Sequence, residues 1–218
     1  MRSEAEQDSV LSMEGLARIA VLFAREDSHY KTMAECDVYD VARDARTYDG
    51  PWPVVAHPPC RAWGRLAHMA NPRPDERNLA RLAVALVREF GGVLEHPAAS
   101  KLWPAQRLPA PGAGRDGFGG WTLGITQHWW GHRATKGTLL YVVGCGPQDI
   151  PDLPELQLGE GTHVIAQDTR ARAGGKRLKV GDFGYRPFVT HAEREHTPPE
   201  LASWLVALAQ RCQTRANV

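Results

Sequence analysis

The 218-residue sequence predicts an α/β fold, in which helices flank a sheet. Two observations carry this prediction. Short apolar runs of the kind that form buried strands recur through the first 144 residues. The stretch 53–97 also reads strand, helix, strand, which predicts two parallel strands joined by a right-handed crossover. The length of the chain suits one domain.

The expected elements ahead of the crossover helix are all short. The run A-R-I-A-V-L-F-A at 17–24 has the β-branched and apolar content of a buried strand. A short helical turn is expected at 28–35. The segments 36–41 and 53–57 are the second and third expected strands.

The clearest element is a helix that begins at Asp75. Asp75 is in the N-cap position and Gly91 is where a C-cap glycine should be. The strand G-V-L-E-H-P at 92–97 follows. The apolar residues of the helix recur every three or four positions and form one face: Leu79, Leu82, Ala83, Leu86, Val87 and Phe90.

Loops and two further elements are expected in the rest of the chain. Residues 104–120 are rich in glycine and proline, which predicts a loop. The stretch 121–132 is rich in aromatic residues and histidine, and T-L-L-Y-V-V-G at 138–144 predicts a strand. Residues 197–212 predict a helix with Thr197 as its N-cap and prolines in its first turn.

The chain is expected to divide into a flexible leader at 1–14, an α/β core at 15–144, a loop-rich insertion at 145–190 and a helix at 191–218 that completes the core. The formal net charge of +1 neither favours nor excludes nucleic acid. The four cysteines form no C-x-x-C pair, which argues against a zinc ribbon and a disulfide scaffold. No apolar run approaches the ~18–20 residues of a membrane span. The expected location is therefore the cytoplasm, with no membrane partner.

Two reactive side chains are expected at one edge of the sheet. Cys60 follows one strand in V-V-A-H-P-P-C, and Glu95 ends the next in G-V-L-E-H-P. Ligands of open parallel sheets bind beyond these carboxyl ends. A thiolate is a nucleophile, with Arg61 and Arg65 as nearby positive charges, and a carboxyl near apolar walls can have a raised pKa and donate a proton. The alternatives are an inert buried cysteine and a solvated glutamate.

The segment V-V-A-H-P-P-C-R-A-W-G, the helix after it and G-V-L-E-H-P resemble the core of the DNA cytosine-5 methyltransferases. In that family one strand ends in Pro-Cys and the next in Glu-Asn-Val. Pro59, Cys60 and Glu95 match that pattern, and the two residues after Glu95 do not. The resemblance implies a Rossmann-like methyltransferase sheet with flanking helices. That sheet is trimmed in the cofactor half, because 41–53 is too short for another strand and helix.

The resemblance also implies a reaction. Cys60 would add to carbon 6 of cytosine and make carbon 5 nucleophilic. Glu95 would hydrogen-bond ring nitrogen 3 and the exocyclic amine. S-adenosylmethionine would supply the methyl group, and the cytosine would be flipped out of duplex DNA. Arg133 and Lys136, ahead of the strand at 138–144, stand where the family has two arginines near its active site.

The cofactor would bind at the loop after the first strand, where the family has a glycine. V-L-F-A-R-E-D-S-H-Y at 21–30 contains none. E-H-T-P-P-E-L-A at 195–202 resembles the segment that lines the family's cofactor site. An acidic residue after the second strand would bind the ribose hydroxyls, with a turn carboxylate as the alternative for Asp40. The expected cofactor contacts are Phe23, Ser28, Asp37, Asp40, Pro58 and Thr197.

Basic and aromatic side chains would contact DNA, and 145–190 would form a small target-recognition region. A solvated basic loop is the alternative for 170–179, and a packing role is the alternative for Trp129. No histidine pair has an obvious third ligand, so no metal is expected. A short, trimmed chain suits a bacteriophage or mobile element. The expected DNA contacts are Arg61, Arg65, Trp129, Arg170, Arg172, Lys176 and Arg177.

Three interpretations of function follow from these residues. The first is a DNA cytosine-5 methyltransferase with S-adenosylmethionine as methyl donor. The second is an enzyme of the same fold that modifies a pyrimidine nucleotide or uses another one-carbon donor, and the glycine-free loop motivates it. The third is a catalytically inactive DNA-binding homologue. The oligomeric state stays open, and a monomer is compatible with the sequence.

Overall fold

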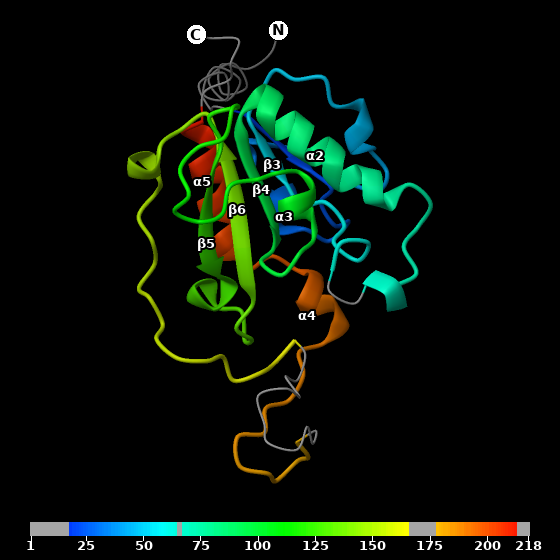
Figure 1. Ribbon diagram of the computed structural model, residues 1–218, viewed down its shortest axis with the longest axis vertical. Coiled ribbons are helices and arrows are strands. Elements are labelled where there is room, and N and C mark those ends of the chain that lie inside the picture. The colour runs from blue at the N-terminus through cyan, green and yellow to red at the C-terminus, as the bar shows by residue number, and fades with distance from the viewer. Residues whose placement is uncertain (1–17, 65–66, 166–177, 213–218) are drawn as a thin grey trace, which may run out of the picture.

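A computed structural model describes residues 18–64, 67–165 and 178–212 of the chain (Figure 1). The fold is α/β, as predicted, with one mixed six-stranded sheet in the order β2-β1-β3-β4-β6-β5. The strands are β1 Ile19–Leu22, β2 Cys36–Tyr39, β3 Val54–Ala56, β4 Gly92–Pro97, β5 Trp121–Thr126 and β6 Gly137–Val143. The helices are α2 Glu76–Phe90, α3 Leu102–Ala105, α4 His191–Glu195 and α5 Pro199–Gln210.

The direction of the strands brings many loop residues to one edge of the sheet. Strands β2, β1, β3 and β4 are parallel, and β6 runs antiparallel to both β4 and β5. The pairing aligns Leu22 with Ala56 and Ala56 with Leu94, so β1 and β3 end level with each other and β4 continues for three residues beyond them. The strand order reverses between β1 and β3, which is the switch point where open α/β sheets bind ligands.

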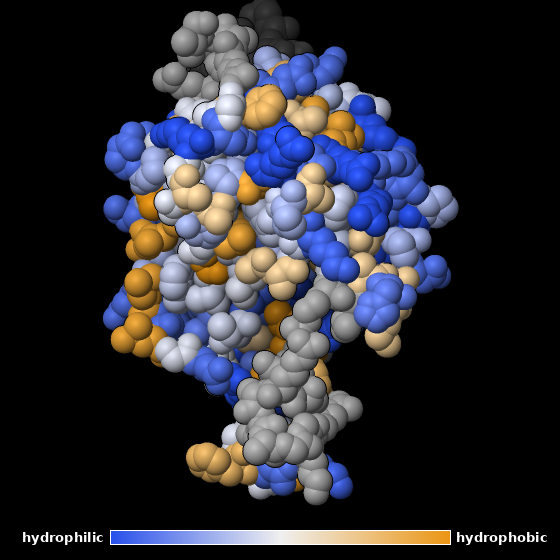
Figure 2. Space-filling view, viewed as in Figure 1, coloured by the Kyte–Doolittle hydropathy of each residue, from blue (hydrophilic) through white to orange (hydrophobic). Residues whose placement is uncertain are grey.

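Helices cover both faces of the sheet. Helix α2 packs against β3, β4 and β6, and α5 packs on the opposite face against β4, β3 and β1 (Figure 1). The central strands are buried on both faces, which explains their unbroken apolar runs. The outward positions of α2 are mostly polar, and Figure 2 shows hydrophilic residues over this part of the surface.

The predicted crossover unit β3-α2-β4 is confirmed. The two cap residues of its helix are the predicted ones, but Asp75 caps the helix in an unexpected conformation. Asp75 occupies the N-cap position with a left-handed backbone, φ 63°, and its side chain caps no backbone N–H. Gly91 is the C-cap, also at positive φ. Helix α5 begins two residues later than predicted, with Pro198 as its N-cap in place of Thr197.

Three elements were not predicted, the strand β5 and the short helices α3 and α4. The predicted leader at 1–14 lies outside the described residues, as does 166–177 within the predicted insertion. Two isolated bridges fix the described ends of the insertion. His163 bridges to Ala134 outside the insertion, and Val164 bridges to Phe188 within it.

Candidate functional site

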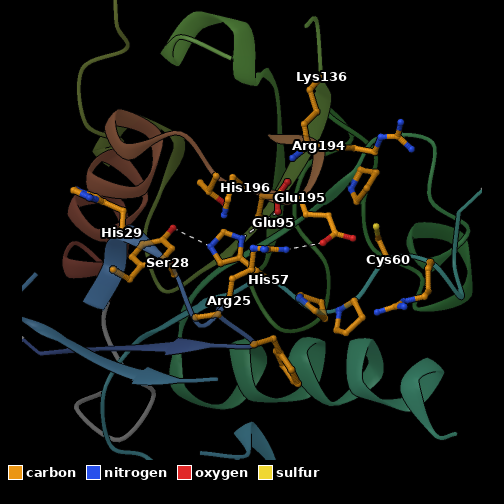
Figure 3. A pocket seen from close by; sticks show the side chains of 18 of the residues that line it. Arg25, Ser28, His29, His57, Cys60, Glu95, Lys136, Arg194, Glu195 and His196 are labelled. Carbon is orange, nitrogen blue, oxygen red and sulfur yellow. Dashed lines mark hydrogen bonds and ion pairs between the residues drawn. The ribbon is translucent and has the colours of Figure 1, made fainter. Parts of the chain in front are cut away.

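A pocket of about 430 Å³ lies at the sheet edge where β1, β3 and β4 end (Figure 3). Its volume is in the range of small-molecule sites. Helix α4 and the turn into α5 form its other wall. The lining includes Phe23, Arg25, Ser28, Tyr30, His57, Pro58, Pro59, Cys60, Arg61, Glu95, Lys136, His191, Arg194, Glu195, His196 and Thr197.

Cys60 is exposed in this pocket, and a tight turn holds its backbone. The carbonyl of Cys60 accepts hydrogen bonds from the amides of Trp63 and Gly64, each at 2.9 Å. The Trp63 indole is fully buried and donates to the Arg77 carbonyl at 3.1 Å, which anchors the turn to α2. Pro58 and Pro59 restrict the backbone conformation of the segment that leads from β3 to Cys60.

The surroundings of Cys60 raise the pKa of its thiol, whereas an activated thiolate was expected. Desolvation by the pocket walls raises the pKa of the Cys60 thiol, and the negative charge of Glu95 raises it further. Lys136 opposes both effects by lowering this pKa. The nearby Arg61 pairs with Glu76, with Nε and Oε1 2.9 Å apart. Cys60 is therefore a thiol at neutral pH.

Glu95 is held as an anion, so the expectation of a raised pKa was wrong. Burial by itself raises the pKa of Glu95, but the hydrogen bond from His57 and the charge of Lys136 lower it to about 2. The His57 Nδ1 atom lies 3.1 Å from Glu95 Oε2, and Gln127 Nε2 donates to Oε1 at 3.0 Å. An ionised carboxylate accepts hydrogen bonds but cannot donate a proton.

His57 connects Glu95 to the first strand. Its Nε2 atom lies 2.8 Å from the hydroxyl of Tyr30, which is fully buried in a 3₁₀ turn after β1. His57 and Glu95 are each 12% exposed. The three side chains come from three segments that the parallel register places side by side.

Of the two predicted basic residues before β6, one lies in the pocket. Lys136 lines it and affects the pKa values of both Cys60 and Glu95. Arg133 is not in the lining and forms an ion pair with Glu193 of α4, its Nε donating to Oε1 at 2.8 Å. Arg133 therefore lies outside the predicted catalytic centre, and its side chain holds α4 through Glu193.

The predicted cofactor residues divide into two groups. Phe23, Ser28, Pro58 and Thr197 line the pocket. Phe23 has a left-handed backbone, φ 62°, so the conformation that glycine usually provides is adopted here by an aromatic residue.

The two predicted ribose-binding acids do not line the pocket. Asp37 pairs with Arg43, and Asp40 accepts from Lys31 Nζ at 2.5 Å and from the Ala42 amide at 2.8 Å. The Lys31 hydrogen bond lowers the pKa of Asp40 to about 2, with help from the backbone amides. Both carboxylates stabilise the turn after β2, which is the alternative stated for Asp40.

Ion pairs hold helix α4 against the loop after β1. Arg25 Nη1 lies 2.6 Å from Glu195 Oε2. Asp27 joins the same group, since its carboxylate is 3.0 Å from Arg25 Nε and 2.9 Å from His196 Nε2. The wall that α4 contributes to the pocket is therefore attached to the β1 side by charged contacts.

Most of the predicted DNA-binding residues lie outside the described parts of the chain. Arg65, Arg170, Arg172, Lys176 and Arg177 lie outside the described residues. Arg61 lines the pocket, whereas Trp129 packs against Trp130 and the core beside α5, with ring centroids 6.0 Å apart. Within the described ranges, no group of three histidine, cysteine or acidic side chains is arranged to hold a metal.

The hydrogen bonds that His57 and Gln127 form with Glu95 were not predicted from the sequence. One signal was available, because His57 directly follows β3 just as Glu95 follows Leu94, and parallel neighbours in register bring such residues together. Gln127 had a weaker signal, since β5 was not predicted. Arg194 and His196 had none, because α4 was not recognised.

Scans of the chain against models of protein families, curated proteins and solved structures find no match. None of the helices in the described part of the chain has the length and hydrophobicity needed to cross a bilayer.

Proposed function

We propose that this protein transfers a methyl group from S-adenosylmethionine to carbon 5 of cytosine in DNA, through a covalent adduct with Cys60. One observation carries the proposal. A cysteine and a buried glutamate from successive parallel strands line one pocket at the switch point of the sheet. This is the pair of residues that the sequence resemblance implies.

The chemistry begins with addition of the thiol to the base. Sulfur of Cys60 bonds to carbon 6, the thiol proton passes to ring nitrogen 3, and carbon 5 becomes an enamine carbon. Carbon 5 takes the methyl group, for which S-adenosylmethionine would supply an electrophilic carbon and leave as a neutral thioether. Loss of the carbon 5 proton to water and elimination of sulfur restore the ring double bond between carbons 5 and 6. The nitrogen 3 proton returns to sulfur, which frees Cys60 as a thiol.

The pocket continues from Cys60 toward the loop after β1, which offers groups that suit a nucleoside-bearing cofactor. Phe23 provides an aromatic surface, and Ser28 and Thr197 provide hydroxyl groups. The Glu195 carboxylate, which Arg25 shares through an ion pair, is a negative charge on this side that a cationic sulfonium favours. These contacts support a Rossmann-like methyltransferase assignment for the sheet.

Cationic side chains at the same pocket favour a phosphate-bearing substrate. Lys136 and Arg194 both line it, and no ion pair joins either side chain to another described residue. Arg61 adds a third positive charge, although Glu76 shares it. A substrate with phosphates beside the base would meet these charges.

Methyl transfer is tested by incubating the protein with duplex DNA and isotopically labelled S-adenosylmethionine, followed by mass spectrometry of the nucleosides. Labelled 5-methylcytosine is expected from the wild type and from Cys36→Ser, a matched change outside the pocket lining. Cys60→Ser should form none. Equal product from Cys60→Ser would reject the proposal.

A second candidate is an enzyme that modifies a pyrimidine nucleotide or uses another one-carbon donor. The observation in its favour is that Asp37 and Asp40 pair with basic residues and stand outside the pocket lining. Calorimetric titration with S-adenosylmethionine separates the two candidates. Measurable binding supports the first, and no binding by the folded protein supports the second.

A further inference from the structure

Tyr30, His57 and Glu95 form a hydrogen-bonded chain with one consistent direction. Tyr30 is completely buried, and burial raises the pKa of its hydroxyl well above the usual value, so it stays protonated. Among the described residues, the only hydrogen-bond partner of this hydroxyl is His57 Nε2, at 2.8 Å. If Tyr30 donates its proton there, Nε2 is the acceptor and the imidazole donates through Nδ1.

That tautomer matches the other end of the chain. His57 Nδ1 is 3.1 Å from Glu95 Oε2 and can donate to it. Gln127 Nε2 donates to the other oxygen at 3.0 Å. Each carboxylate oxygen has two lone-pair positions, so one position on each oxygen remains for a ligand in the pocket.

We propose that Tyr30 and His57 are positioning residues that keep Glu95 anionic, so that Glu95 binds the Cys60 adduct of cytosine more strongly than cytosine itself. This inference rests on the function proposed above, and it concerns residues that the family resemblance does not assign.

Formation of the adduct changes which protons the base presents to Glu95. Ring nitrogen 3 of free cytosine carries a lone pair, which an anionic carboxylate repels. When Cys60 adds to carbon 6, its thiol proton ends on nitrogen 3, which then donates to Glu95. The exocyclic amine donates to the second oxygen in both states. The interaction with nitrogen 3 therefore changes from unfavourable to favourable as the adduct forms, which is a way to accelerate addition.

The same geometry selects the base. Uracil and thymine carry a proton on nitrogen 3 but present a carbonyl oxygen where cytosine has its amine. That oxygen would face an anionic carboxylate oxygen and be repelled by it. An anionic Glu95 therefore favours cytosine as substrate class and disfavours thymine.

The groups that act on this chain are few. Cys60, Lys136 and His96 lie near Glu95, and Glu195 of α4 acts on Cys60. Burial lowers the pKa of His96 to about 4, so this imidazole is neutral at physiological pH. Lys136 is the one cation among them, and it assists His57 in keeping Glu95 ionised.

The test is the rate of adduct formation with DNA that contains 5-fluorocytosine, measured between about pH 5 and pH 8. His57→Phe removes the donor to Glu95, so burial should raise the pKa of Glu95. The rate should fall about 100-fold and decrease further toward low pH. His57→Asn keeps an N–H donor near Nδ1 and should recover most of the rate. His68→Phe, an exposed matched control, should match the wild type.

Tyr30→Phe keeps the aromatic ring and removes only the hydroxyl, so it provides a second variant if His57→Phe does not fold. It should slow adduct formation about tenfold. Equal rates and equal pH profiles in His57→Phe, Tyr30→Phe and the wild type would overturn the inference. If the wild type itself forms no adduct, the proposed function fails. Infrared spectra then test the ionisation of Glu95 separately, through a protonated-carboxyl band of His57→Phe that Glu95→Gln removes.

Discussion

At the scale of single residues, Cys60 stands between opposing influences. Desolvation and Glu95 hold its proton on, and Lys136 favours its release. A resting thiol is consistent with an enzyme that protects its nucleophile until a base arrives. Lys136 acts on this thiol through its charge.

Replacing Lys136 should therefore make Cys60 less reactive. In Lys136→Met the thiol pKa should rise, and alkylation of Cys60 by iodoacetamide at neutral pH should slow about fivefold, the effect of roughly 1 kcal/mol of lost attraction. Lys136→Arg keeps the charge and is the control. The alkylation rate is measured by mass spectrometry of the peptide that contains Cys60. An unchanged rate in Lys136→Met would contradict the assigned electrostatics.

Ionised Glu95 should make the free energy of unfolding decrease as the pH falls. Its pKa is about 2 in the folded protein against 4.5 for the free group, so the anion stabilises the fold above about pH 4.5. That contribution is lost as the pH falls toward 2. Between these pH values the free energy of unfolding should fall less in Glu95→Gln than in the wild type, by on the order of 2–3 kcal/mol. Glu89→Gln, on the exposed side of α2, is the control for chemical denaturation.

At the scale of elements, the contact between β3 and β4 depends on Gly92. This residue has a φ of 109°, and a Cβ atom placed on it would lie 2.0 Å from the carbonyl oxygen of Val54. The alignment of Val54 with Gly92 sets the register that brings His57 beside Glu95. The site at the carboxyl end of these strands therefore depends on a glycine at their other end.

Gly92→Ala should destabilise the protein by about 3 kcal/mol or more, because the close atoms belong to backbone and cannot move aside. Gly137→Ala at the start of β6 is the matched control, since the nearest atom to its Cβ would be 3.9 Å away. The two midpoints of thermal unfolding should differ clearly. Similar midpoints would mean that the register of β3 and β4 is not as described.

At the scale of the whole molecule, the α/β fold could be predicted because its signals are local. The apolar runs and the 3.6-residue period of α2 each follow from a short stretch of sequence. The crossover rule then placed Cys60 and Glu95 on one edge. Strand β5 was missed although W-T-L-G-I-T alternates apolar and polar residues, because it was taken together with the histidine-rich and tryptophan-rich residues that follow it, and α4 was missed because five residues give no periodicity.

The state of the site residues could not be predicted, because it depends on neighbours from distant segments. The pKa of Glu95 was expected to be raised on the basis of burial alone. His57 and Lys136, 38 and 41 positions away in the sequence, reverse that outcome. In the same way, Lys31 and Arg43 form ion pairs with Asp40 and Asp37, the two acids that the sequence assigned to a cofactor.

The central claim is that Cys60 forms a covalent bond to a cytosine in DNA. The most direct measurement is a denaturing gel of the protein incubated with duplex DNA in which 5-fluorocytosine replaces cytosine, together with S-adenosylmethionine. Fluorine at carbon 5 blocks the final proton loss, so the adduct should accumulate. A slower-migrating band is expected for the wild type and Cys36→Ser and should be absent in Cys60→Ala. No band for the folded wild type on DNA of any sequence, or an equal band for Cys60→Ala, would contradict the claim.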